Sequence, residues 1–260
     1  MKTKGCGMYR GFNLDMNGFD VARFVEIGRG LHNYNKSLVE ERLESFKDRN
    51  GNLIASEIIA KWFPLIEADV FLSHSHKDEV KVIGLAGWLK ETFGLTSFID
   101  SCIWGYSADL LKIIDDEYCY DKSSATYDYQ KRNRSTSHVY MMLSTALAKM
   151  INECECVFFV NTPNSISPKS YIENEITDSP WIYSEIAMTS LIQRRVPADH
   201  RGPMIKALAA LERLAEGVNV KYDINLKHLA PLDADDLKGW ARVNASKGSD
   251  ALDALYSLKG

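Results

Sequence analysis

Glu185 is the single charged residue in the stretch "SPWIYSEIAMTSLI", residues 179–192. Ser179 is a good helix N-cap, and Pro180 suits the first helical position, where no amide hydrogen is needed. The stretch therefore predicts a helix, on which Trp181 and Glu185 share one face because they lie four residues apart. Burial on an apolar face would raise the pKa of the carboxyl group unless hydrogen-bond donors compensate.

This pattern allows two interpretations of Glu185. A carboxylate held among aromatic and apolar side chains is a candidate catalytic group, because active sites shift carboxyl pKa values in this way. The alternative is a glutamate at the border of the core, whose carboxylate reaches solvent beside a packing tryptophan. Helical periodicity favours neither interpretation over the other.

A polar loop, "SHSHKDE", follows a predicted strand at residues 73–79. A loop at the carboxyl end of a strand is well placed to contact a polar ligand, so Ser73, His74 and Ser75 are candidate binding residues. Two histidines separated by one residue also suggest a metal, but no further ligands stand at a suitable spacing, and we expect no metal site. The loop lacks the glycines of a phosphate-binding loop or a dinucleotide fingerprint.

Asp100 ends a second predicted strand in "FIDSCIWG", residues 98–105. A carboxylate at this position commonly holds a ribose hydroxyl, although aspartate also starts turns readily. Trp104 is either an exposed stacking group for a ligand or a cover for the core. Both residues are candidate substrate-binding residues.

Several other kinds of chemistry are disfavoured. The sequence has no Ser-His-Asp order, no G-x-S-x-G elbow and no H-E-x-x-H pair. Its odd number of cysteines, without a C-x-x-C pair, argues against a disulfide framework and predicts a reduced, cytoplasmic protein; the five are Cys6, Cys102, Cys119, Cys154 and Cys156. A net charge of −4, with no apolar run of membrane-spanning length, predicts neither nucleic acid nor a membrane as partner.

Strand and helix patterns alternate along most of the chain. Apolar, β-branched segments predict strands at 68–73, 96–100, 156–162 and 219–224. Helical patterns lie at about 79–92, 138–152, 181–193 and 204–215. This alternation predicts βαβ units and an α/β fold of the flavodoxin-like three-layer type with a central parallel sheet.

Two regions lie outside this alternation. Residues 1–62 contain two helical patterns, 37–46 and 52–63, and are expected to form an N-terminal helical extension. Residues 101–137 are expected to be a long insertion with a short helix, because usual strand–helix loops have only about 2–6 residues. The α/β domain is then expected to span 63–260, with a helical C-terminal part.

The order of four segments resembles a Toll/interleukin-1 receptor (TIR) domain of the bacterial, NAD-cleaving type. "DVFLSHSHKDE" is similar to the family's opening strand and loop, "FGLTSFID" to its next strand, "CVFFVNT" to a later strand, and "SPWIYSEI" to its W-x-x-x-E motif. The resemblance covers about 66–224. The family's loop after the second strand is usually short, so the long segment in this chain departs from the pattern.

The resemblance implies an activity and a set of roles. Enzymatic TIR domains cleave the nicotinamide–ribose bond of NAD, which is their substrate rather than a cofactor, and release ADP-ribose or a cyclic ADP-ribose isomer. The family's catalytic glutamate matches Glu185, its motif tryptophan matches Trp181, and its first loop matches Ser73, His74 and Ser75. Self-association through the domain, a downstream effector that senses the product, and antiphage defence of the Thoeris type are also implied.

Two other functions remain open. The chain is alternatively a non-catalytic TIR adaptor that acts through homotypic protein–protein interaction. A third reading is an enzyme resembling nucleoside deoxyribosyltransferases, which share a related architecture and a catalytic glutamate. The retained glutamate favours an enzyme over an adaptor, and product identity would separate the two enzymes.

Overall fold

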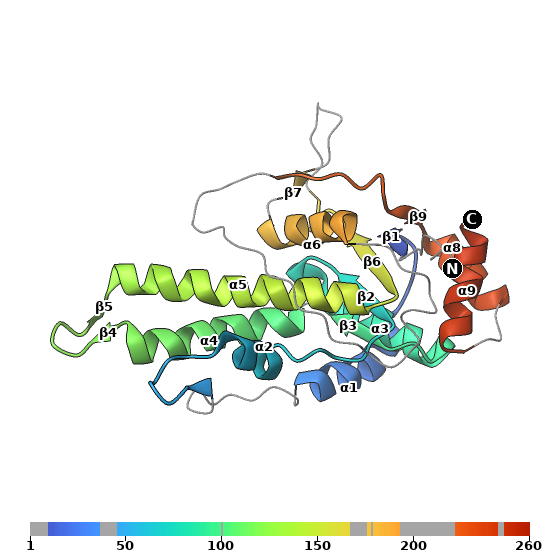
Figure 1. Cartoon of the computed structure of the whole chain (residues 1–260). Coiled ribbons are helices and arrows are strands. Elements are labelled where there is room, and N and C mark those ends of the chain that lie inside the picture. The colour runs from blue at the N-terminus through green and yellow to red at the C-terminus, as the bar shows by residue number, and fades with distance from the viewer. Residues whose placement is uncertain are drawn as a thin grey trace, which may run out of the picture.

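A computed structural model describes residues 10–36, 46–99, 101–166, 176–177, 179–192, 222–243 and 247–260. Its central sheet has five strands, which are β1 (Arg10–Asp15), β2 (Val70–Ser73), β3 (Ser97–Ile99), β6 (Cys156–Asn161) and β9 (Ala230–Leu232). They lie in the order β3-β2-β6-β1-β9, and all neighbours are parallel. With helices on both faces (Figure 1), the predicted three-layer α/β fold is confirmed.

The helices of the two outer layers come from different parts of the chain. On one side of the sheet α1 (Val25–Lys36) packs against α3 (Glu79–Phe93), and on the other side α5 (Tyr129–Glu153) packs against α6 (Pro180–Leu191) (Figure 1). The remaining helical elements are η1 (Ala22–Phe24), α2 (Ala55–Trp62), η3 (His76–Asp78), α4 (Ser101–Tyr118), α8 (Ala234–Val243) and α9 (Ser249–Leu258).

The N-terminal segment corrects the sequence-based division of the chain. Residues 10–15 form β1, which lies between β6 and β9 inside the sheet, so the prediction that 1–62 is only a helical extension is wrong there. The signal is a short alternation in which Phe12 and Leu14 are fully buried and the residues that alternate with them, Gly11, Asn13 and Asp15, are small or polar. The second predicted helix is confirmed as α2, and the first lies at 37–46, almost wholly outside the described residues.

The fourth predicted strand, 219–224, does not belong to the central sheet. Tyr222–Asp223 form β8, which pairs antiparallel with β7 (Ile176–Thr177) in a separate two-stranded sheet rather than with the central strands. In the central sheet β1 lies next to β6, and β9 pairs with β1 at the edge of the sheet. The predicted helix at 204–215 lies outside the described residues.

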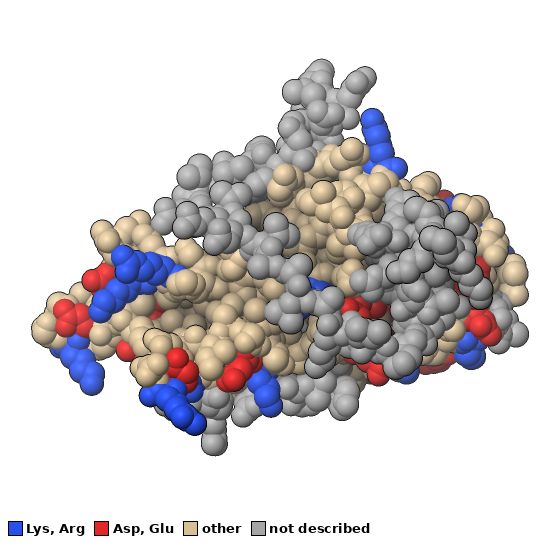
Figure 2. Space-filling view, in the orientation of Figure 1, with Lys and Arg blue, Asp and Glu red and all other residues tan. Residues whose placement is uncertain are grey.

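The expected insertion at 101–137 is mostly helical. Helix α4 begins directly after β3, and α5 returns after a small antiparallel pair, β4 (Tyr120–Asp121) and β5 (Thr126–Tyr127). The side chain of Asp128 caps α5 by accepting a 2.9 Å hydrogen bond from the amide of Lys131. The two helices form a hairpin that extends beyond the sheet (Figure 1), and acidic and basic side chains are interspersed at its projecting end (Figure 2).

A buried carboxylate fastens α4 to α5. Asp115 is 4% exposed and accepts hydrogen bonds from Arg132 Nε, at 2.9 Å, and from the hydroxyl of Ser135. The Cys119 thiol also donates to it at 3.4 Å. The sequence predicts only a short helix in this segment, because polar contacts between helices leave no periodic apolar signal.

Candidate active site

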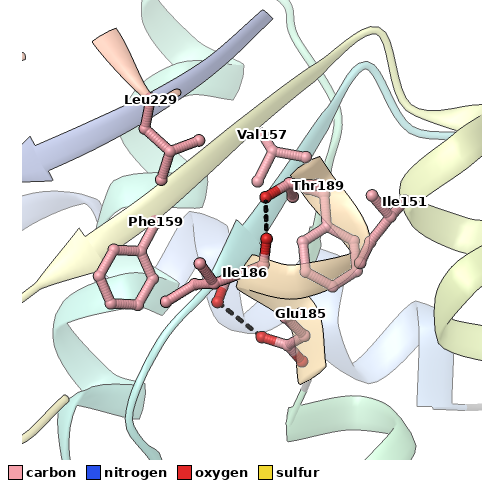
Figure 3. Close-up of a pocket in the computed structure, with 9 residues that line it drawn as sticks. Ile151, Val157, Phe159, Glu185, Ile186, Thr189 and Leu229 are labelled. Atoms are coloured by element: carbon pink, nitrogen blue, oxygen red, sulfur yellow. Dashed lines mark hydrogen bonds between the residues drawn. The ribbon is translucent and has the colours of Figure 1, made fainter. Parts of the chain in front are cut away.

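The structure brings together two residues that sequence patterns single out independently. Ser73 is the last residue of β2, and its hydroxyl donates a 2.6 Å hydrogen bond to Glu185 Oε2 on α6 (Figure 3). Ser73 is 2% exposed and Glu185 is 1% exposed. The carboxylate therefore lies inside the protein against the sheet, and the interpretation that it reaches solvent at the border of the core is wrong.

The start of α6 sets the direction of Glu185. The Ser179 side chain accepts a 3.3 Å hydrogen bond from the amide of Ile182, and Pro180 is the first helical residue, as predicted. Ile182 and Ile186 are buried in an apolar cluster with Phe159 of β6. This packing turns the Glu185 side chain toward the sheet, because helical neighbours three and four residues apart share a face.

A small pocket lies between α6 and the sheet beside the carboxylate (Figure 3). Its lining residues are Phe71, Ser73, Ile151, Val157, Phe159, Glu185, Ile186, Thr189 and Leu229. Its empty volume of about 220 Å³ includes open solvent at its mouth, and the enclosed part has room for about one water molecule. Ligand pockets usually have about 300–1,000 Å³, so this space would not enclose a dinucleotide.

The pocket lies at the winding switch of the sheet, which is the topological switch point where successive strands of the chain are added on opposite sides. The chain passes from β2 to β3 on one side, and β6, the next strand of this sheet in the chain, lies on the other side of β2. In open α/β sheets, ligands bind outside the carboxyl ends of the strands at such a point, because the loops there diverge. Ser73 ends the strand next to this crevice.

Asp78 links the two loops that border the crevice. Its Oδ2 accepts a 2.5 Å hydrogen bond from Thr162 Oγ1, and its Oδ1 accepts a 2.9 Å bond from Asn164 Nδ2. Asp78 belongs to the "SHSHKDE" loop after β2, whereas Thr162 and Asn164 follow β6. No sequence pattern reveals this link, because the bonded residues are 84 and 86 positions apart in the chain.

The neighbouring candidates take different positions. His74 is 4% exposed, and its Nδ1 lies 3.3 Å from the carbonyl oxygen of Leu72. Ser75 is half-buried and precedes η3, where its carbonyl accepts a 2.8 Å hydrogen bond from the amide of Asp78. Both residues therefore shape the loop beside the crevice.

Of the remaining candidates, Trp181, Trp104 and Asp100, the structure describes the side chain of Trp181. Trp181 is half-buried, and its ring makes an edge-to-face contact with Tyr140 of α5, with ring centroids 5.4 Å apart. The backbone of Trp104 belongs to α4, and its side chain lies outside the described residues, as does Asp100.

A second polar pair lies one helical turn beyond Glu185. Thr189 Oγ1 donates to the carbonyl oxygen of Ile186 at 2.7 Å and lies 2.8 Å from His228 Nε2. Because a hydroxyl has one proton, this arrangement makes His228 Nε2 the donor toward Thr189. The contact joins the last turn of α6 to the segment that enters β9.

Thiol and metal chemistry find no support in the described part of the chain. Burial raises the pKa of the Cys154 and Cys156 thiols well above their usual range, so they are protonated and unreactive at neutral pH. Within the described ranges, no group of three or more His, Cys, Asp or Glu side chains is arranged to hold a metal ion. No helix of those ranges is long and apolar enough to cross a membrane.

Comparison of the chain with protein-family models, curated proteins and solved structures finds no match. The resemblance to TIR domains therefore depends on the four sequence segments alone. The site is defined by its own geometry, which is a buried carboxylate held by a serine at the winding switch of a parallel sheet.

Proposed function

We propose that the chain cleaves the nicotinamide–ribose bond of NAD, with Glu185 as the catalytic carboxylate. The observation that carries this proposal is the hydrogen bond from Ser73 to Glu185 at the winding switch. It joins the glutamate of the W-x-x-x-E motif to the first residue of the "SHSHKDE" segment, at the end of β2. These are two of the four segments on which the resemblance to NAD-cleaving TIR domains depends.

The chemistry suits a single buried carboxylate. Breaking the bond between C1′ of the ribose and the pyridinium nitrogen leaves positive charge on the sugar, while nicotinamide departs as a neutral molecule. A carboxylate near the ribose stabilises that charge and accepts hydrogen bonds from the sugar hydroxyls. The bond from Ser73 occupies one oxygen of Glu185 and fixes its direction before the substrate arrives.

Apolar surroundings strengthen this electrostatic effect. Phe71, Val157 and Phe159 line the space beside Glu185, and each of them is at most 1% exposed. Interactions between charges are stronger where water is excluded, so a sugar cation beside Glu185 would be stabilised more than in solvent. The enclosed space has room for about one water molecule, so the reacting ribose would approach Glu185 from the open mouth of the pocket, with the rest of NAD along the carboxyl ends of the strands.

Product chromatography tests the proposal. Purified protein is incubated with NAD and, separately, with deoxynucleosides, and Glu185→Gln is run beside the wild type. Release of nicotinamide from NAD by the wild type alone supports it. Base release from deoxynucleosides without cleavage of NAD would assign the chain to the deoxyribosyltransferase-like alternative. Equal turnover of NAD by Glu185→Gln would remove Glu185 from the catalytic role.

A further inference from the structure

The carboxyl ends of β1 and β6 carry polar side chains that the proposed chemistry does not use. In the parallel register Asn13 pairs with Phe159, and Asp15 pairs with Asn161. Residues paired in this way point to the same face of the sheet. Phe159 lines the pocket under α6, so these polar side chains lie on the face that carries Glu185.

Asn13 has an unsatisfied polar atom. Its amide oxygen Oδ1 is buried, and it has no hydrogen-bond partner in the described part of the chain. A buried acceptor without a partner lowers stability, and each such group in a native protein calls for an explanation. A ligand that donates a hydrogen bond to Oδ1 would explain why this acceptor has no protein partner. Buried polar groups without partners are tolerated mainly at functional sites.

Asp15 stands next to Asn13 at the end of the same strand. Its side chain is exposed, and Oδ1 accepts a 2.8 Å hydrogen bond from the amide of Asn17, which orients the carboxylate. Asn161, its partner in the register, is half-buried. One carboxylate and two amides at a strand end offer acceptors for sugar hydroxyls and both donors and acceptors for a base.

We infer that Asn13, Asp15 and Asn161 bind the adenosine half of a dinucleotide. A carboxylate at the carboxyl end of a strand suits the ribose diol, and asparagine amides pair well with the adenine edge. Ser73 and Asn13 each lie beside Phe159 in register, so they are separated by two strand spacings, about 10 Å. A dinucleotide has two nucleosides joined by a diphosphate. It would lie across the carboxyl ends of β2, β6 and β1, with one nucleoside near Ser73 and the other near Asn13.

This inference rests on the proposed function for the nicotinamide half, but its test uses each half alone. Binding of adenosine monophosphate and of nicotinamide mononucleotide is measured by ligand-detected NMR for the wild type, Asn13→Leu and Asp15→Asn. Asn50→Ala, in an exposed turn far from the sheet in sequence, is the control. Asn13→Leu should weaken adenosine monophosphate binding about tenfold and leave nicotinamide mononucleotide binding unchanged.

Thermal melting separates recognition from structural support. Because Asn13→Leu removes an unsatisfied buried acceptor, its melting temperature should equal or exceed that of the wild type. Unchanged affinity for adenosine monophosphate in both variants, or equal weakening of both mononucleotides, would overturn the inference. If Asn13→Leu fails to fold, Asp15→Asn decides, because its side chain is exposed and should be neutral to folding.

The two proposals fail in different ways. If the wild type binds adenosine monophosphate through Asn13 but releases no nicotinamide from NAD, the adenosine subsite stands and the proposed reaction falls. If Asn13→Leu cleaves NAD with an unchanged KM, the reaction stands and the subsite falls.

Asp15 adds a second prediction. Its carboxylate would repel a 2′-phosphate, so Asp15→Asn should reduce any preference for NAD over NADP.

Discussion

The hydroxyl of Ser73 is joined to Glu185 Oε2 by a 2.6 Å hydrogen bond across 112 residues of sequence. Ser73 ends a central strand, and Glu185 lies on the helix that covers that strand, so the bond fixes the carboxylate relative to the sheet. A buried carboxylate is costly unless hydrogen-bond donors compensate, and Ser73 supplies one. This pair is both a structural contact and the proposed centre of the reaction.

Ser73→Ala should lower both stability and activity. The substitution removes a donor from a buried carboxylate, and hydrogen bonds to charged groups contribute about 1.5–3 kcal/mol. Urea denaturation should show a loss in the free energy of unfolding of that size. Nicotinamide release should fall by more than the loss of folded protein accounts for, because Glu185 loses its fixed direction.

Ser97→Ala is the matched control. Ser97 is also a buried serine in the sheet, 6% exposed, but its Oγ has no partner in the described part of the chain. Removing an unsatisfied hydroxyl should leave stability unchanged or slightly increased. Equal destabilisation by Ser73→Ala and Ser97→Ala would show that the bond to Glu185 contributes nothing.

Two glycines of α1 should respond in opposite ways to alanine. A Cβ at Gly28 would lie 1.8 Å from the carbonyl oxygen of Ile83, so α1 and α3 would have to separate. Gly28→Ala should therefore destabilise the fold by about 3 kcal/mol or more. At Gly30 nothing lies within 4 Å of the added Cβ, and Gly30→Ala should stabilise the helix by about 0.5–1 kcal/mol. Thermal melting should show a lower melting temperature for Gly28→Ala and a higher one for Gly30→Ala.

The hairpin of α4 and α5 should depend on Asp115. Asp115→Ala removes the buried acceptor through which Arg132 and Ser135 of α5 are bonded to α4, which should cost about 1–3 kcal/mol. Asp109→Ala, at an exposed position of the same helix, should change stability by less than about 0.5 kcal/mol. Hydrogen exchange should localise the effect of Asp115→Ala to α4 and α5. A uniform loss of protection across the sheet would contradict a local role.

Acid stability should depend partly on Asp233. The backbone amides of Asp236 and Asp235 donate to this carboxylate at the start of α8 and hold its pKa below the usual range. Because the folded pKa is the lower one, the stabilisation is complete above the ordinary aspartate value of about 3.9 and is lost as pH falls through the folded pKa. Asp233→Ala should therefore melt at a lower temperature at pH 7, and the difference should narrow toward pH 2. A difference in melting temperature that stays constant from pH 7 to pH 2 would exclude a role for the negative charge of Asp233.

The sequence predicted much of the central sheet because β2, β3 and β6 are nearly continuous apolar runs. It failed for β1, where the alternation is short and begins after a polar start, and for β9, whose three residues include a proline. Neither strand has enough apolar length to be recognised without its neighbours in the sheet. Because β1 lies beside β6, Asn13 and Asp15 at its carboxyl end become candidate binding residues.

Helix capping was the most reliable local signal at the site. Ser179 and Pro180 correctly predicted where α6 begins, and so the face on which Glu185 lies. The partner of Glu185 was not predictable, because the position of Ser73 at the end of a strand indicates a loop near a ligand and not a contact with α6. Contacts between distant segments, such as Asp78 with Thr162, depend on the topology of the sheet and leave no pattern in the sequence.

Nicotinamide release from NAD by the wild type and by Glu185→Gln tests the central claim most directly. Glutamine keeps the size of the side chain and an acceptor for Ser73, so the variant should fold with a similar melting temperature. The account predicts release by the wild type and a rate at least about 100-fold lower for Glu185→Gln. Equal rates for the two folded proteins would contradict it.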